Sequence, residues 1–289
     1  MRLRAPAKLN LTLEVLDRRP DGLHNLRSLM VPVDLCDELE IEPHAGGFEF
    51  ICDRPELAAG NLVERAVRAL DLPSPDWRIT LRKAIPVGSG MGGGSSDAAA
   101  VLAAAQGGAF GSLGTRDYLA IARSLGSDVP FFLVRTGALV ESAGERVTAV
   151  GALPPWHAVI VAPPIGISTA QAYADLDARP KITRPRSGSV TLQALAALQR
   201  AEFERVNELL SNDFEAVALQ RSPEVGIAIA ALRAAGTAHP IMSGSGSCVY
   251  ALAPSSGERD ALARGLSLPP RYRVYSVAFD RADDWKAAA

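Results

Sequence analysis

The sequence is poor in cysteine and lacks long apolar runs. Its three cysteines, Cys36, Cys52 and Cys248, are widely spaced and form no C-x-x-C pair. This spacing argues against both a disulfide framework and a cysteine-ligated zinc site. Proline, glycine or charged residues interrupt every apolar stretch well before the ~20 residues that a membrane span needs, and residues 1–6 lack the apolar core of a secretory signal. We therefore expect a protein of the reducing cytoplasm with no membrane partner.

The sequence also lacks an excess of charge of one sign. It has 30 basic and 32 acidic residues, a formal net charge of −2, and no long basic run. A nucleic-acid binder neutralises many phosphates with clustered Lys and Arg, so we expect a small-molecule ligand and no nucleic-acid partner. The length of 289 residues and the 48% hydrophobic content are those of an ordinary globular protein with about two domains.

A glycine-rich segment over residues 86–96 is the most informative feature that is present. It reads Pro-Val-Gly-Ser-Gly-Met-Gly-Gly-Gly-Ser-Ser and joins an alternating, strand-like run over 77–83 to a helix-forming run over 97–105. The first N–H groups of a helix lack internal partners, and glycines can turn successive N–H groups inward. The segment therefore predicts a phosphate-binding loop, in which Ser95 and Ser96 either cap the helix or turn a hydroxyl toward a phosphate or its metal ion.

Two better-known phosphate motifs do not fit this segment. Gly88, Gly90 and Gly93 satisfy G-x-G-x-x-G, but that fingerprint needs an acidic residue at the end of the next strand, and Asp117 lies in a helix-like run instead. The pattern G-x-x-x-x-G-K-[ST] is absent because no lysine follows the glycines. A flexible connection is the ordinary alternative for such a stretch. If the loop binds a nucleotide, the lysine must come from elsewhere in the chain.

Lys8 is the candidate for that lysine. Residues 6–15 alternate polar and apolar side chains, so Lys8, Asn10 and Thr12 are expected on one face of a strand and the intervening leucines on the other. A rigid strand would then present a cation and an amide side by side. The alternative is a solvated lysine on an exposed face, which is the usual position of this residue type.

Asp128 is the candidate acid. It stands between Gly126, which can end one helix, and Pro130, which can begin the next. An aspartate at a helix entrance commonly caps the helix or complements its dipole. The functional alternative is a carboxylate that stays ionised beside a lysine and accepts a proton from an attacking hydroxyl.

A second loop of small residues runs from Met242 to Tyr250 and leads into a strand. It is either a plain turn or a place where the backbone approaches a ligand or the other glycine loop closely.

The order of expected elements indicates an α+β protein whose second half is an antiparallel sheet with helices on one face. Strands are expected over 9–15, 26–33, 37–41, 48–52, 157–162, 247–253 and 273–279, with a hairpin over 138–150. Helices are expected over 62–70, 97–106, 116–125, 203–218, 224–235 and 257–266, with a short one from Pro130. A domain boundary is expected at 152–155, and residues 177–190 are expected to form an exposed, mobile loop.

The three motifs together, in this order, resemble those of the GHMP kinases, the superfamily of galactokinase, homoserine kinase, mevalonate kinase and phosphomevalonate kinase. Within it, the chain is most similar to the 4-diphosphocytidyl-2-C-methyl-D-erythritol kinases of the non-mevalonate route to isoprenoid (terpenoid) precursors. The similar segments span residues 6–250. They are 6–10, 21–26, 60–62, 86–97, 126–130 and 243–248.

The resemblance implies a two-domain fold with the active site in the cleft between the domains. A ribosomal-protein-like, ATP-binding domain would cover residues 1–154 and a ferredoxin-like domain residues 155–289. The implied activity is transfer of the γ-phosphoryl group of ATP to the 2-hydroxyl of 4-diphosphocytidyl-2-C-methyl-D-erythritol, an alcohol acceptor. Lys8 and Asp128 would be the catalytic pair, in a reaction that depends mostly on positioning and charge stabilisation.

The resemblance also assigns binding roles. Mg²⁺ would bridge the phosphates and touch Ser96, and Asn61 would reach the adenine, although Asn61 and Glu64 fit a capping box equally well. The ATP loop would comprise Pro86, Val87, Gly88, Ser89, Gly90, Met91, Gly92, Gly93, Gly94, Ser95 and Ser96. The substrate would be bound by Asn10, His24, Tyr173 and Gly244.

The sequence departs from this family at the cytidine end. Leu23 stands where the family usually has tyrosine, which removes one aromatic wall, while His24 remains as the base-contacting histidine. Tyr173 would be the second stacking aromatic, worth ~1–3 kcal/mol per stacked base. The alternative for Tyr173 is a semi-buried helix tyrosine that only packs.

Two other functions stay open. A sister kinase of the superfamily could act on homoserine or mevalonate, although residues 21–24 argue against it. The second alternative is a non-catalytic nucleotide-binding module, since the amino-terminal fold of the superfamily is similar to a ribosomal-protein domain. The presence of both Lys8 and Asp128 argues against this function. We expect a monomer or a weak homodimer.

Overall fold

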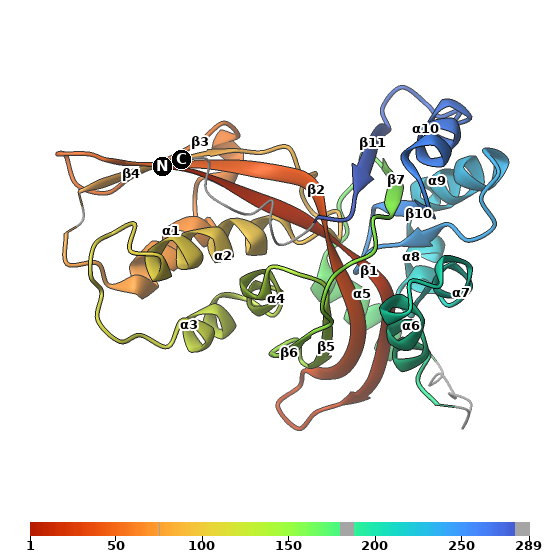
Figure 1. Ribbon diagram of the computed structural model, residues 1–289, viewed down its shortest axis with the longest axis horizontal. Helices are drawn as coiled ribbons and strands as arrows, with labels where there is room; N and C mark the ends of the chain where they lie inside the picture. Colours follow the sequence, from red (N-terminus) through yellow and green to blue (C-terminus); the bar gives the residue numbers. More distant parts are fainter. Residues whose placement is uncertain (75, 180–187, 281–289) are drawn as a thin grey trace.

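Two β-sheets form the frame of the protein, seen in a computed structural model that describes residues 1–74, 76–179 and 188–280 (Figure 1). One sheet has seven strands and the other has four. Helices α1–α4 lie beside the larger sheet, on which α6 also packs, and α9 and α10 contact the smaller sheet. The arrangement confirms the predicted α+β class.

The larger sheet is built on two long antiparallel strands, β1 (Arg2–Arg18) and β2 (His24–Pro43). Residues 38–43 of β2 pair with β4, whereas residues 26–30 pair with β5. The other strands are β3 (Glu49–Cys52), β4 (Trp77–Arg82), β5 (Ala138–Ser142), β6 (Arg146–Ala149) and β8 (Ser211–Asn212). Since β8 pairs in parallel with β1, the second half of the chain contributes a strand to this sheet.

The helices of the first half pack on β1 and β2 through α2, which is alanine-rich and buried along nearly its whole length. Small side chains let this helix approach the sheet closely, so its amino-terminal end is held near β1. The helices are the 3₁₀ turn η1 (Pro55–Leu57), α1 (Leu62–Leu70), α2 (Gly93–Gln106), α3 (Tyr118–Leu125) and α4 (Val129–Val134).

The smaller sheet is antiparallel with the order β11-β7-β10-β9. Strands β7, β9 and β10 are buried almost throughout, whereas the edge strand β11 is largely exposed. Along β7, Ile160 packs toward β1 and β2, while Val159 and Val161 pack toward α9. Its strands are β7 (His157–Ala162), β9 (Ile241–Met242), β10 (Val249–Ala253) and β11 (Arg273–Ala278). The helices are α5 (Thr169–Asp177), α6 (Val190–Gln199), α7 (Phe203–Glu208), α8 (Glu215–Arg221), α9 (Pro223–Ala234) and α10 (Ser256–Arg264).

A shared core joins the two sheets. Leu9 and Leu11 of β1 pack in one cluster with Ile160 of β7 and Tyr250 of β10. The buried Tyr250 hydroxyl donates a hydrogen bond of 2.8 Å to the Asn10 carbonyl oxygen. The strand that carries the candidate lysine is therefore fixed from both halves of the chain. The domain boundary at 154 stays a prediction.

Several elements differ from their sequence prediction. The strands predicted over 26–33 and 37–41 are one strand, β2, because both parts pair with β1 across a register shift. The helix predicted over 203–218 is two helices separated by β8, where Ser, Asn and Asp are weak helix formers. Helices α5 and α6 were not among the predicted elements. Residues 180–187 of the predicted loop over 177–190 lie outside the described residues.

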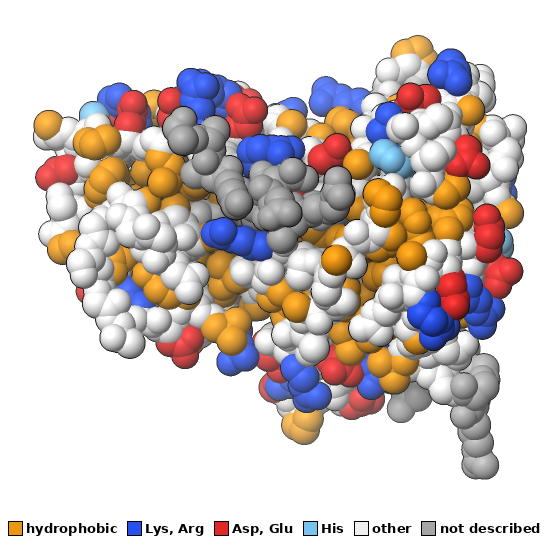
Figure 2. Space-filling model, in the orientation of Figure 1, with side chains coloured by type: hydrophobic (Ala, Val, Ile, Leu, Met, Phe, Trp, Pro, Cys, Tyr) orange, Lys and Arg blue, Asp and Glu red, His pale blue; other side chains and the backbone are white. Residues whose placement is uncertain are grey.

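Positive and negative side chains are interspersed over the face seen in Figure 2. This face presents no broad basic field of the kind that nucleic-acid binding requires. Within residues 1–74, 76–179 and 188–280, no helix combines the length and the apolar character needed to cross a bilayer.

Candidate functional site

Lys8 is buried in the centre of the protein, with only 3% of its surface exposed. Its backbone N–H donates to the Met91 carbonyl oxygen at 3.0 Å, and its ammonium group donates to Asn10 Oδ1. The amide of Asn10 donates in turn to Ser28 Oγ at 2.8 Å. The solvated alternative for Lys8 is therefore wrong, and the predicted pairing of Lys8 with Asn10 along one strand face is confirmed.

Asp128 occupies the N-cap position of α4 but does not cap the helix through its side chain. Its carboxylate accepts no capping hydrogen bond, and its Oδ2 lies 3.9 Å from Lys8 Nζ. Burial lowers the pKa of Lys8 below the 10.5 of an ordinary lysine, and the charge of Asp128 opposes that shift. Of the two interpretations that the sequence left open for Asp128, the geometry favours a carboxylate directed at the lysine.

The glycine loop packs against the turn over residues 242–247, which contains most of the third motif (243–248). A Cβ atom on Gly90 would come within 2.0 Å of the Ser243 carbonyl oxygen, and φ at Gly90 is +78°, so no other residue fits there. Ser243 Oγ donates to the Gly90 carbonyl oxygen at 3.1 Å, and the Cys248 N–H donates to that of Ser89 at 3.0 Å. The turn therefore has the second of its predicted roles, a close backbone approach.

Helix α2 begins at Gly93, four residues before its predicted start at Asp97. Gly92, in the left-handed region at φ +72°, occupies the N-cap position and makes no side-chain cap. The prediction that Ser95 or Ser96 caps the helix is wrong, because both lie inside its first turn. The Ser96 hydroxyl is buried and has no hydrogen-bond partner among the described residues.

A cavity of about 640 Å³ brings most of the predicted residues together. Met91 and Ser96 are buried behind its wall, and His24 does not border it. The predicted residues that border it are Lys8, Asn10, Asn61, Pro86, Val87, Gly88, Ser89, Gly90, Gly92, Gly93, Gly94, Ser95, Asp128, Tyr173 and Gly244.

His24 borders a second cavity of about 740 Å³, which shares Ser127 and Tyr173 with the first. The rings of His24 and Tyr173 stack on each other with centroids 4.7 Å apart and planes at 15°. His24 Nε2 also lies 2.7 Å from Asp177 Oδ1. The two residues predicted to contact a base are thus neighbours, although each covers one face of the other. Leu23 lines this cavity and is 54% exposed.

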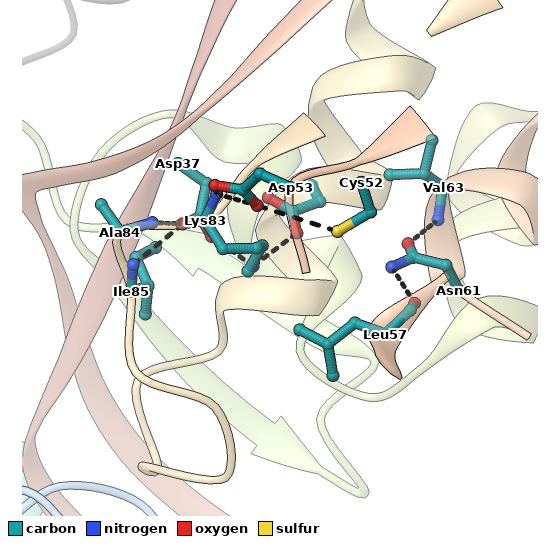
Figure 3. A network of polar contacts seen from close by, with 10 residues as sticks. Asp37, Cys52, Asp53, Leu57, Asn61, Val63, Lys83, Ala84 and Ile85 are labelled. Atoms are coloured by element: carbon teal, nitrogen blue, oxygen red, sulfur yellow. Dashed lines mark hydrogen bonds and ion pairs between the residues drawn. The ribbon is translucent and has the colours of Figure 1, made fainter. Parts of the chain in front are cut away.

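The structure confirms Asn61 as the N-cap residue of α1, whereas its contact with adenine stays a prediction. Its Oδ1 accepts the Val63 N–H at 2.9 Å and thereby caps α1, while its Nδ2 donates to the Leu57 carbonyl oxygen at 2.9 Å. The residue also borders the 640 Å³ cavity, and its link to Leu57 is visible in Figure 3.

A buried ion cluster below the glycine loop was not predicted from the sequence. Lys83, just before the loop, bonds Asp37 of β2 (Figure 3). It also bonds Asp97, just after the loop, at 2.7 Å. Asp37 Oδ1 also accepts the N–H groups of Ala84 and Ile85 at 2.6 and 2.9 Å. Burial alone would lower the pKa of Lys83, but Asp97 and Asp37 outweigh it and raise that pKa. The cluster therefore ties both ends of the glycine loop to β2.

A compositional signal could have identified this cluster. The sequence has only four lysines among its 30 basic residues, so arginine supplies most of the surface charge. The two lysines within the described residues, Lys8 and Lys83, are both buried beside the cavity.

Comparison with known proteins agrees with this geometry. Two family models match, GHMP kinases N terminal domain over residues 61–136 and GHMP kinases C terminal over residues 194–269. The 4-diphosphocytidyl-2-C-methyl-D-erythritol kinase of Citrifermentans bemidjiense is 41% identical over 91% of this chain and 93% of its own length. That of Geobacter sulfurreducens is 39% identical over 99% and 97%.

Solved structures agree as well. A crystal structure of 4-(cytidine 5'-diphospho)-2C-methyl-D-erythritol kinase has a TM-score of 0.78 at 35% identity and covers 97% of this chain and 99% of that one. A homoserine kinase from Cytophaga hutchinsonii, at 18% identity and a TM-score of 0.69, shares the fold and covers 97% and 95%. The fold is that of a GHMP kinase, which confirms the predicted superfamily. Within it, the chain belongs to the family of 4-diphosphocytidyl-2-C-methyl-D-erythritol kinases.

Replacing Lys83 by Met should destabilise the protein strongly, because Asp37 and Asp97 would stay buried without a counter-ion. We expect Lys83→Met to lower the free energy of unfolding by about 3–5 kcal/mol in urea denaturation. The matched control is Arg82→Met, at the neighbouring position, where the side chain is 54% exposed and pairs with Glu40 at 3.8 Å. This control should cost about 1 kcal/mol or less. Equal stability of the two variants would contradict the role given to the cluster.

The ammonium group of Lys8 should lose its proton at a lower pH than an ordinary lysine, because burial lowers its pKa. Activity that needs the charged form should fall on the alkaline side of the pH profile as this proton leaves. In Asp128→Asn, the Lys8 pKa should fall further, since the carboxylate that raises it is gone. NMR titration of the lysine side chains measures the Lys8 pKa in the wild type and in Asp128→Asn, with the Lys83 resonance as the internal control. An unchanged Lys8 pKa in Asp128→Asn would refute an electrostatic interaction between Lys8 and Asp128.

Proposed function

We propose that this chain is an ATP-dependent kinase that phosphorylates the 2-hydroxyl of 4-diphosphocytidyl-2-C-methyl-D-erythritol in the biosynthesis of isoprenoid precursors. The observation that carries the proposal is the convergence of Lys8, Asp128 and the glycine loop on one cavity. Kinase relatives of the same name support it over nearly the whole length of the chain. The proposal places the protein in the cytoplasm, as a monomer or weak homodimer with a small-molecule substrate.

Lys8 and Asp128 act as the catalytic pair in this proposal. As the substrate hydroxyl oxygen attacks the γ-phosphorus, Asp128 accepts the hydroxyl proton, and the bond between the γ-phosphorus and the bridging oxygen breaks with ADP as the leaving group. Lys8, held by Asn10 and 3.9 Å from Asp128, offsets negative charge on the transferring group. The side chains of Lys8 and Asn10 stand on a strand fixed by the shared core, so their positions relative to the loop do not depend on a flexible segment.

ATP lies with its triphosphate along the glycine loop at the amino-terminal end of α2. The peptide N–H groups and the helix dipole favour negative charge there. Among the described residues, no group of three or more His, Cys, Asp or Glu side chains is placed to hold a metal ion, so Mg²⁺ would arrive with ATP. The Ser96 hydroxyl is a hard oxygen without a partner among those residues, which suits such an ion, but it lies behind the cavity wall, so contact with the ion would require the first turn of α2 to move. The ion would neutralise charge on the phosphates.

The substrate extends from the catalytic pair toward His24. Asn10 and Gly244 border the part of the cavity next to Lys8, and Tyr173 borders both cavities. The cytidine end therefore occupies the second cavity, and His24 and Tyr173 contact the base there. Leu23 gives that cavity an aliphatic edge where the family usually has an aromatic one.

Two alternatives receive less support. The homoserine kinase structure shares the fold at only 18% identity, so it supports no choice of that substrate. A non-catalytic nucleotide-binding module would have no need of an ammonium group buried next to a carboxylate.

Substrate specificity is tested with a panel of alcohols. ADP release should require ATP together with 4-diphosphocytidyl-2-C-methyl-D-erythritol, while homoserine and mevalonate should give none above background. Phosphorus NMR of the product should show a new phosphate monoester on the methylerythritol part. Turnover of another alcohol in place of the cytidine-linked one would refute the assignment.

Removing either member of the catalytic pair should abolish most turnover while leaving the nucleotide bound. We expect Asp128→Asn to lower kcat by about 10²- to 10⁴-fold and Lys8→Ala by about 10²- to 10³-fold. Calorimetry should still find ATP binding in both variants. The matched control is Asp117→Asn, because Asp117 caps α3 by accepting the Ala120 N–H at 2.9 Å. This control should keep the kcat of the wild type, and near-normal turnover in Asp128→Asn or Lys8→Ala would remove the assigned role.

A further inference from the structure

A four-residue segment, Asn212–Glu215, lies directly behind the 242–247 turn. Its first residue ends β8, which pairs with Thr12 and Leu13 of β1. The Asp213 N–H donates to the Leu13 carbonyl oxygen at 3.1 Å, and Asp213 Oδ2 accepts the Val15 N–H at 2.6 Å. The segment is thus fixed to the same strand that carries Lys8 and Asn10.

Asn212 holds the turn through both hydrogens of its amide. Its Nδ2 donates to the Met242 carbonyl oxygen at 2.7 Å and to the Gly244 carbonyl oxygen at 2.8 Å. Its Oδ1 accepts the Phe214 N–H at 2.9 Å, which fixes the orientation of the amide. Met242 and Gly244 are both buried, so the loss of Asn212 would leave two carbonyl groups away from water without these donors.

Glu215 holds the same turn at its first residue. Its Oε2 accepts the Met242 N–H at 3.0 Å. Burial raises the pKa of Glu215, and the Met242 hydrogen bond opposes that shift. Asn212 and Glu215 therefore bond three backbone groups of the turn, the N–H and C=O of Met242 and the C=O of Gly244.

The opposite side of the turn faces the catalytic pair. A Cβ atom on Gly244 would come within 3.0 Å of Lys8 Nζ and 2.7 Å of the Gly90 carbonyl oxygen. The backbone of Gly244 therefore lies between the Asn212 amide and the Lys8 ammonium group. A shift of this turn would displace the wall against which Lys8 and the glycine loop are packed.

Phe214 connects the segment to the substrate end. It is 2% exposed, borders the 640 Å³ cavity, and meets the Tyr173 ring edge-on with centroids 4.8 Å apart and planes at 90°. Tyr173 stacks in turn on His24. The segment thus touches the wall of the phosphoryl-transfer site with Asn212 and supports the aromatic wall of the second cavity with Phe214.

We propose that Asn212, Phe214 and Glu215 are positioning residues of this kinase: Asn212 and Glu215 set the 242–247 turn against Lys8, and Phe214 sets Tyr173 against the cytosine. The inference rests on the proposed function for its substrate. None of the three residues needs to touch the reacting atoms, because each acts through a group that does. Since all three stand on one segment bonded to β1, the segment fixes the distance between the two ends of the substrate.

The first experiment tests whether the hydrogen bonds from Asn212 to the turn affect catalysis without a general loss of structure. Asn212→Leu keeps the approximate size of the side chain and removes both N–H donors without adding charge. We expect kcat to fall by roughly tenfold to 100-fold, because displacements of about 1 Å have such effects. One ATP should still bind per chain in calorimetry. The Lys8 side-chain resonance should titrate at a higher pH than in the wild type, because the wall that buries this group has loosened.

Control variants test whether the effect is specific. Asn207→Leu changes the same residue type on α7, outside both cavities, and should leave kcat and the Lys8 resonance unchanged. Glu215→Gln still offers an oxygen to the Met242 N–H and should retain most of the activity that Glu215→Leu loses. Wild-type kcat in Asn212→Leu, or equal losses in Asn212→Leu and Asn207→Leu, would overturn the role of the turn.

The second experiment examines Phe214. Phe214→Leu removes the edge-on aromatic contact and should raise the KM for the cytidine-linked substrate by about twofold to tenfold. The KM for ATP should stay as in the wild type, a split that a general loss of structure would not produce. Equal changes in the two KM values, or an unchanged KM for the cytidine-linked substrate, would overturn the positioning role of Phe214. Absence of wild-type turnover would instead refute the proposed function, and the Lys8 resonance in Asn212→Leu would still test the turn.

Discussion

The burial of one ammonium group, that of Lys8, is the constraint on which the cleft depends. A buried charge is costly unless it is paired and hydrogen-bonded, so the chain must bring Asn10 and Asp128 to it from two separate elements. Asn10 comes from the same strand face and needs no long-range organisation. Asp128 comes from the start of α4, more than a hundred residues later, and its position requires the packing of α4 against α2 and of α2 against β1.

Glycine is what allows two distant loops to share this centre. At Gly90 and Gly244 the backbones of the glycine loop and of the 242–247 turn approach to distances that any side chain would prevent. Polar contacts then fix each segment from the side away from this contact. The Lys83 cluster fixes the glycine loop, and Asn212 fixes the 242–247 turn. The site is thus formed by backbone surfaces, and the side chains around them mainly hold those surfaces in register.

The sequence predicts the parts of this arrangement that depend on local periodicity and fails for those that depend on distant pairing. Alternation along residues 6–15 was enough to place Lys8 and Asn10 on one face of a strand. The role of Asp128 could not be decided from the sequence, because a helix cap and a general base have the same local sequence. Only the position of Lys8 distinguishes the two roles. The Lys83 cluster was missed because Asp37 is 46 residues away on another strand. The assigned roles of His24 and Tyr173 stay predictions.

The scarcity of lysine gives the cleft a distinctive chemistry. Arginine carries most of the positive charge of this chain, and within the described residues the two side-chain amines are both buried at the cavity. A depressed pKa means that a larger share of the Lys8 amine is neutral, and hence nucleophilic, at a given pH than for an ordinary lysine. The amine of Lys83 has its pKa raised instead. Of the two amines at the cavity, that of Lys8 is therefore the one whose charge changes first as the solution becomes alkaline.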